Sequence, residues 1–258
     1  PASTDPRTLR LFHRGVEQAI FVAGENDGIL NVADFVEFYG LKNDGTLDTE
    51  LYTSPSAQPH TLYNLYSDTT SYFLTAGVGQ GKRMNLIAES NSGLTAETFH
   101  YDEKLLILKD QYTAGIDYGD TQRTAFDLGE GWTGSQILQN QTGSYTIEGI
   151  SNAATSAAGP VIELLLTGRG PMEHAAEIYA GARLLASVTF SGYQSYKHVQ
   201  TLQWSDVTAD GKIIIGVKVK GSGGQPDRLS VGYITLRYPQ QIDLDNAAEK
   251  IFTLTENA

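Results

Sequence analysis

The stretch that decides the fold is Lys212-Ile213-Ile214-Ile215-Gly216-Val217-Lys218-Val219-Lys220, which directly follows the turn pair Asp210-Gly211. Its aliphatic side chains recur at every second position, and its lysines fall on the other face, which is typical of a half-buried strand. The Gly-rich residues 221–226 separate it from a second strand, predicted for residues 229–238. Two long strands with one apolar face need a second sheet to cover that face, so this half of the chain is predicted to be a β-sandwich.

Turn residues recur at short spacing upstream of this stretch, as they do in sandwiches. Further strands are therefore expected at residues 143–150, 161–167, 175–180, 183–190 and 199–204. Residues 171–182 also have helical propensity, but Tyr179-Ala180-Gly181-Ala182 separates two alternating segments, which favours strand–turn–strand. One short helix is expected within residues 95–109, where Ala, Glu, Lys and Leu predominate.

The expected fold class is all-β with a minor helix, in two domains and a tail. A small β-rich N-terminal domain is predicted for residues 1–115, and a jelly-roll-like β-sandwich for residues 116–240. Glycines without periodicity at residues 110–131 place the boundary there. The first domain opens with a predicted hairpin around Arg14-Gly15.

The two ends of the chain indicate a piece of a longer protein. The chain opens Pro1-Ala2-Ser3, without an initiating Met or an apolar signal region. Residues 241–258 are interpreted as a tail that leads to a missing downstream domain. The apolar residues of this tail are expected to dock on that domain: Ile242, Leu244, Ile251, Phe252 and Leu254.

Composition excludes several classes of function. The chain has 258 residues and a formal net charge of −12, which argues against a nucleic-acid partner because phosphate neutralisation needs clustered Lys and Arg. It contains no cysteine, which removes disulfides, thiolate metal sites and a cysteine nucleophile. No apolar run approaches the roughly 20 residues that span a bilayer.

No motif for catalysis is present. The five histidines are scattered singly, and no Gly-x-Ser-x-Gly elbow occurs. Residues 77–82 are rich in glycine, but a Walker loop ending at Lys82 needs Gly where Ala76 stands and Ser or Thr where Arg83 stands. We therefore expect that this chain is not itself an enzyme.

Acidic residues concentrate between positions 25 and 50, around the two turns Asn26-Asp27-Gly28 and Asn43-Asp44-Gly45. Carboxylates around such turns are ligands that Ca²⁺ accepts, so Asp27, Asp44 and Asp48 form a candidate metal site for Ca²⁺. An EF-hand is excluded, because Ala23 fills the first loop position when Gly28 is the sixth. The alternative, which the pattern favours, is two turns with solvated acids.

Exposed aromatic rings on a β-sandwich can stack on sugar rings. The candidates are Trp132, Tyr193, Tyr196 and Trp204. The alternative is that both tryptophans fill the core or cap its ends, and with only two tryptophans this alternative is favoured. A cell-surface glycan-binding or adhesion module stays open as the second functional interpretation.

Several motifs follow one another in order along the chain. They are Asn26-Asp27-Gly28, Asp34-Phe35-Val36-Glu37-Phe38-Tyr39-Gly40, Asn43-Asp44-Gly45, Tyr72-Phe73-Leu74-Thr75, Gly129-Glu130-Gly131-Trp132-Thr133-Gly134 and Asp227-Arg228-Leu229. Together they resemble the N-terminal region of gingipain-type cysteine peptidases, and most of all that of the sortase-like component of the Bacteroidetes type IX secretion system.

In that family the catalytic His and Cys lie in a domain that follows this region. The resemblance therefore implies a non-catalytic N-terminal module, exported to the periplasm or the outer-membrane cell surface. Its implied partner is the downstream peptidase domain of the same chain, which it would pack against, restrain or present. Other components of the secretion system are further partners that the resemblance implies.

Overall fold

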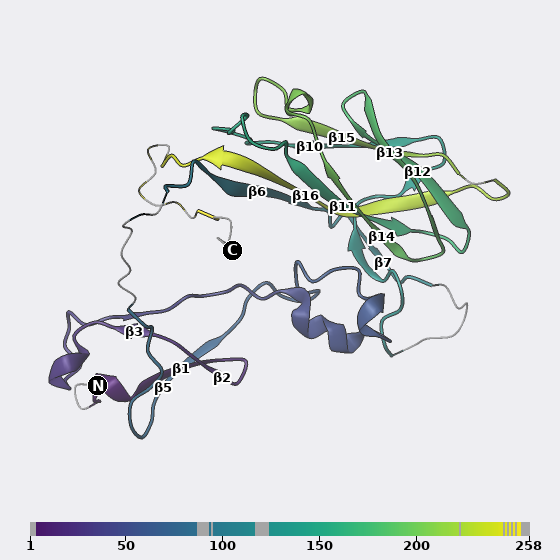
Figure 1. Cartoon of the computed structure of the whole chain (residues 1–258). Coiled ribbons are helices and arrows are strands. Elements are labelled where there is room, and N and C mark those ends of the chain that lie inside the picture. The colour runs from purple at the N-terminus through teal and green to yellow at the C-terminus, as the bar shows by residue number, and fades with distance from the viewer. Residues whose placement is uncertain are drawn as a thin grey trace. The chain divides into compact units, whose positions relative to one another are not determined.

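The computed structural model describes residues 4–86, 93, 95–116, 124–221, 223–244, 246, 248, 250 and 252–253. The chain divides into two compact units, each built from two segments of sequence (Figure 1). The first unit comprises Pro1–Gly45 and Leu62–Leu94, and the second comprises Thr46–Thr61 and Thr95–Ala258. Strands dominate both units, and the helices among the described residues are short 3-10 turns. The all-β class is confirmed.

The first unit is built on a small antiparallel sheet in the order β2-β1-β5. Its strands are β1 (Leu9–His13), β2 (Val16–Gln18) and β5 (Tyr72–Ala76). The expected hairpin around Arg14-Gly15 is confirmed, and both residues take the positive φ that this two-residue turn requires. The remaining elements are η1 (Pro6–Thr8), β3 (Phe21–Val22), η2 (Glu25–Asp27) and β4 (Val36–Glu37).

The second unit is an antiparallel β-sandwich. One sheet has the order β10-β15-β12-β13: β10 (Thr142–Ile147), β15 (Ile213–Val219), β12 (Glu173–Ala180) and β13 (Arg183–Ser191). The other has the order β14-β11-β16-β6: β14 (Ser195–Thr201), β11 (Val161–Gly168), β16 (Arg228–Gln241) and β6 (Phe99–Ile107). Inward side chains from both sheets form one hydrophobic core.

Short elements complete the second unit. β9 (Ile137–Leu138) extends the second sheet by pairing with the first two residues of β16. β7 (Gln111–Thr113) and β8 (Gly131–Thr133) form a separate two-stranded ribbon. The 3-10 turns are η3 (Gly45–Leu51), which begins at the last residue of the first unit's first segment, η4 (Pro55–Ala57) and η5 (Trp204–Asp206).

The alternation in the deciding stretch is confirmed. Ile213, Ile215, Val217 and Val219 of β15 are 0% exposed, whereas Ile214 between them is 44% exposed. β15 lies between β10 and β12, so it is an interior strand of its sheet, and its outer face carries the lysines. The strands predicted on either side of it are found as β10–β14 and β16, and residues 171–182 do form a strand and turn.

The helix expected within residues 95–109 is wrong. Phe99–Ile107 is strand β6, paired with β16 along nine residues. Leu106 faces the core, and His100 is buried with its Nε2 2.9 Å from Gln240 Oε1. Helical propensity is a weak local preference, and pairing with a buried central strand outweighs it.

The division into units differs from the expected boundary near residue 115. Residues 95–115 belong with the sandwich through β6, and residues 46–61 join the same unit. Within this unit Thr53 N donates to Phe126 O at 2.8 Å, and Tyr52 Oη donates to Glu130 O at 2.9 Å. Whether the predicted domains fold independently stays a prediction.

Part of the tail packs on the sandwich. Tyr101 N of β6 donates to Thr253 O at 2.8 Å, and the Phe252 ring stands edge-on to His100 with 4.7 Å between ring centroids. Phe252 therefore has a packing partner within this chain, and its docking on a further domain stays a prediction. Ile242 and Leu244 are exposed, and Ile251 and Leu254 lie outside the described residues.

Candidate functional site

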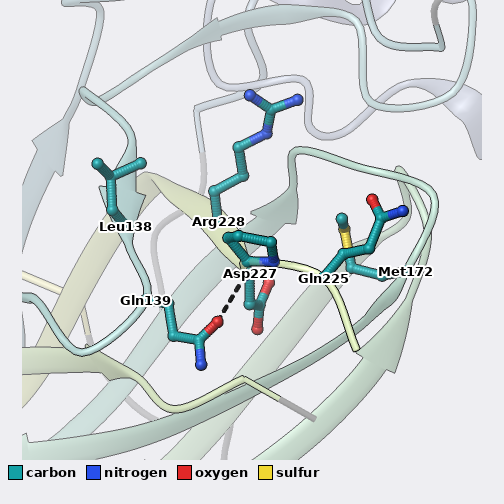
Figure 2. Close-up of a pocket in the computed structure, with 7 residues that line it drawn as sticks. Leu138, Gln139, Met172, Gln225, Asp227 and Arg228 are labelled. Atoms are coloured by element: carbon teal, nitrogen blue, oxygen red, sulfur yellow. Dashed lines mark hydrogen bonds between the residues drawn. The ribbon is translucent and has the colours of Figure 1, made fainter. Parts of the chain in front are cut away.

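A cavity of the second unit opens where β16 begins. It has a volume of about 400 Å³, and seven residues line it (Figure 2): Leu138, Gln139, Met172, Gln225, Pro226, Asp227 and Arg228. Gln139 holds Asp227 in place in the lining of the cavity through two hydrogen bonds. Its backbone N donates to Asp227 O at 2.8 Å, and its side-chain Oε1 accepts from Asp227 N at 3.0 Å. The pairing of β9 with β16 therefore positions the cavity.

Beneath the cavity, a buried histidine and aspartate hold three segments together. His174 Nδ1 lies 2.5 Å from Asp227 Oδ1, and both side chains are essentially unexposed. His174 Nε2 lies 2.8 Å from Gly192 O, an atom that can only accept, so Nε2 carries a proton. Asp227 Oδ2 also accepts from Ala175 N at 3.0 Å. Neither ring nitrogen is left free for proton transfer with a ligand.

Gly168 makes room for this pair. A β-carbon at this position would lie 2.4 Å from His174 Nε2 and 2.0 Å from Gly192 O. Only glycine therefore allows β11 to end where the imidazole ring passes. The His174–Asp227 pair therefore connects the ends of β11, β12 and β16.

Two arginines lie by the cavity, and no carboxylate among the described residues forms an ion pair with either. Arg169 follows β11 and is 3% exposed; its Nε donates to Ser230 Oγ at 2.8 Å and its Nη2 to Thr133 Oγ1 at 2.5 Å. Its Nη1 is buried without a hydrogen-bond partner. Arg228 is exposed, and its Nε donates to Arg169 O at 2.7 Å. Burial, and then the charge of Arg228, lower the pKa of Arg169 to about 10, so both remain cations at pH 7.

The three predicted calcium ligands occupy different settings. Asp27 accepts from Ile29 N at 2.9 Å and from Asn31 Nδ2 at 3.0 Å, and Asp44 lies 3.5 Å from an Arg14 nitrogen. Asp48 is 3% exposed and belongs to the second unit, whereas Asp27 and Asp44 belong to the first. The part of the chain that the structure describes contains no group of three His, Asp or Glu side chains suited to a metal ion. The shared calcium site stays a prediction.

The aromatic residues considered for sugar stacking are mostly used in packing. Tyr196 stacks on Phe190 at the core with 5.6 Å between ring centroids, and Trp204 packs against the same core while its Nε1 donates to Ala157 O. Trp132 is edge-on to Tyr112, and Tyr193 is half-buried. Tyr196 and Trp204 therefore pack against the core, which is the alternative to sugar stacking.

Sequence reasoning did not single out His174, Asp227, Arg169 or Arg228 as a group. The available signals were local: Arg169 stands between two glycines directly after an apolar strand, and Asp227-Arg228 directly precedes another. Neither signal tells which residues meet, since the sequence separation between the pairs exceeds fifty residues.

No protein-family model matches the chain, and no curated protein matches it. Among solved structures, dimeric latent PorU from Porphyromonas gingivalis matches with a TM-score of 0.53 and 13% identity over 99% of this chain. The chain spans about a quarter of PorU, since the match covers 24% of that protein.

Carbohydrate-binding modules match the chain over about half its length. The CBM36-1 domain of a multidomain xylanase, from the hindgut metagenome of Trinervitermes trinervoides, has a TM-score of 0.33 and 14% identity over 52% of this chain and 96% of its own. A CBM36 module in complex with calcium and xylotriose has a TM-score of 0.32 and 15% identity over 51% of this chain and 98% of its own. At these identities the likeness to PorU concerns fold: the chain shares a fold with one part of that protein.

Proposed function

We propose that the chain is a non-catalytic module of a gingipain-like peptidase of type IX secretion, which packs against or presents a downstream catalytic domain. Two separate observations support this function: the sequence motifs that resemble the family, and the fold shared with PorU over nearly the whole chain. The match covers a quarter of PorU, which leaves most of that protein outside it.

The observation that carries the proposal is the bare apolar surface of the first unit. More than half of the exposed large hydrophobic side chains among the described residues belong to this unit, although it is the smaller one. Phe73 and Leu74 of β5 are 66% and 53% exposed, and Phe35 packs its ring loosely on Phe21 with 6.1 Å between centroids. Exposed apolar side chains that lie together, as Phe21 and Phe35 do, mark interaction surfaces on soluble proteins.

The proposal places catalysis outside this chain. The chain has no cysteine, and the reacting His and Cys of the resembled peptidases belong to a following domain. The proposed setting is the periplasm or the outer-membrane surface. The structure describes no helix long and apolar enough to cross a membrane.

The test compares one substitution in two lengths of protein. Phe73→Glu should lower the melting temperature of the full-length protein but leave that of the 258-residue chain unchanged, because Phe73 is exposed in the chain alone. Val199→Glu, at a residue 55% exposed on β14, is the matched control and should change neither protein. An equal effect of Phe73→Glu in both lengths would contradict the proposal.

The glycan-binding alternative has its own measurement. Xylo-oligosaccharides added to the chain should leave the fluorescence of Trp132 and Trp204 unchanged if the module serves a peptidase. A saturable change would favour the glycan-binding interpretation instead.

A further inference from the structure

Arg169 and Arg228 differ from three other arginines of the described chain in their ion pairing. Arg7, Arg83 and Arg183 each form an ion pair with a carboxylate, whereas neither Arg169 nor Arg228 does. A buried cation without a counter-charge is costly, and a buried N–H without an acceptor adds to that cost. Arg169 carries both features.

The carboxylate next to Arg228 in the sequence does not relieve this imbalance. Asp227 directly precedes Arg228, but its Oδ1 lies 2.5 Å from His174 Nδ1 and its Oδ2 accepts from Ala175 N. In Figure 2 the side chains of Asp227 and Arg228 leave the backbone in opposite directions, as successive strand residues do. The charge of Arg228 acts on the buried guanidinium of Arg169, and no carboxylate among the described residues forms an ion pair with either arginine.

Adjacent to this face, the cavity has the lining of a peptide site. Leu138, Met172 and Pro226 supply apolar contact, and Gln139 and Gln225 supply amides. None of the seven lining residues is aromatic, so a ring on which a sugar could stack is missing from the lining. Met is the side chain that adapts best to varied apolar partners.

We propose that this site binds a peptide through a carboxylate, which pairs with the exposed guanidinium of Arg228 beside the buried charge of Arg169, while the neighbouring apolar side chain of the peptide enters the cavity. The planar guanidinium of Arg228 keeps its Nη groups for the ligand, because only its Nε is used by the described protein. The carboxylate is that of an Asp or Glu side chain or of a chain terminus. This inference does not depend on the proposed function.

The test uses side-chain NMR of the chain labelled with ¹⁵N, in which each arginine Nε–H gives a resonance. The probes are the acetylated tripeptide amide Leu-Glu-Leu, its Leu-Gln-Leu counterpart, and acetyl-Leu-Leu with a free terminal carboxylate. We expect the Glu probe to shift the Arg228 and Arg169 resonances saturably, and the Gln probe to bind about tenfold or more weakly, since a charged hydrogen bond is lost. Whether acetyl-Leu-Leu binds as well distinguishes a chain terminus from an acidic side chain.

Two variants make the outcome specific. Arg228→Gln, at an exposed position, should keep the backbone amide spectrum and lose Glu-probe binding by about tenfold or more. Arg237→Gln is the matched control, because Arg237 is exposed on the same strand but its guanidinium lies over the Tyr101 ring. This variant should bind the Glu probe as tightly as the unchanged chain does. The proposal would be overturned by detectable and equal binding of the Glu and Gln probes, or by retained binding in Arg228→Gln. It would also be overturned if none of the three probes gave a saturable shift, or if only an acidic sugar, tri-galacturonate, gave one.

Discussion

At the scale of single residues, the sandwich depends on contacts between buried polar side chains that lie far apart in the sequence. His174 and Asp227 are fifty-three positions apart and meet at 2.5 Å inside the protein. Tyr238 Oη likewise donates to Asp102 Oδ2 at 2.8 Å, across the pairing of β16 with β6. Each contact pairs polar atoms that burial has removed from water.

Removing one member of the buried pair should be strongly destabilising. Asp227→Ala is expected to lower the free energy of unfolding by about 3–5 kcal/mol, because it leaves His174 Nδ1 and Ala175 N buried without their partner. Urea denaturation measures this difference. Asp210→Ala, at an exposed aspartate whose partners are Thr208 and Lys212, is the control and should change stability by about 1 kcal/mol or less. Similar losses in the two variants would show that the buried pair is unimportant.

The pH dependence of stability should report on His60. Burial, and then the charges of Lys109 and Lys197, lower the pKa of His60 from 6.5 to about 4. The unfolded chain therefore binds a proton at His60 between pH 6.5 and 4 while the folded chain does not, so stability falls as pH falls through this window, by about 2 kcal/mol at pH 5.

The substitution that checks this assignment is His60→Phe, which removes the titrating group. Unfolding free energies measured from pH 7 to pH 4.5 should then lose this part of their slope. His198→Gln on β14 is the matched control and should keep the slope. If the slope is the same in His60→Phe as in the unchanged chain, the assignment to His60 is wrong.

At the scale of elements, the sequence predicted the features that depend on neighbouring residues and missed those that depend on residues far away in the chain. The alternation in β15 is local, so burial of every second residue could be read from nine consecutive letters. β6 could not, because its strand conformation comes from pairing with residues 233–241, more than a hundred positions away. The candidate site is missed for the same reason: Arg228 meets Arg169 only once β16 pairs with β11, and Asp227 meets His174 only once the two sheets pack.

The register of β15 makes a sharp prediction for neighbouring residues. Ile215→Ala should lower the free energy of unfolding by about 2–5 kcal/mol, because it opens a cavity in the core. Ile214→Ala, one residue away and 44% exposed, should cost less than about 1 kcal/mol. Chemical denaturation of the two variants compares them directly. A larger loss for Ile214→Ala would place the opposite face of β15 in the core.

At the scale of the whole molecule, the two units differ in how completely they bury their apolar residues. The sandwich has a large continuous core with both sheets contributing, whereas the buried core of the first unit is Leu9, Leu11, Ile20 and Val22 among the described residues. A unit with so small a core and so many exposed apolar side chains fits a module whose surface is completed by another part of a longer protein.

Hydrogen exchange tests the central claim, that a further domain covers the first unit. The amides of residues 72–76, on the exposed edge strand β5, should exchange at least tenfold more slowly in the full-length protein than in the 258-residue chain. The amide of Tyr101, already bonded to Thr253 O in the chain alone, is the internal control and should be protected equally in both. Equal exchange of residues 72–76 in the two proteins would contradict the account.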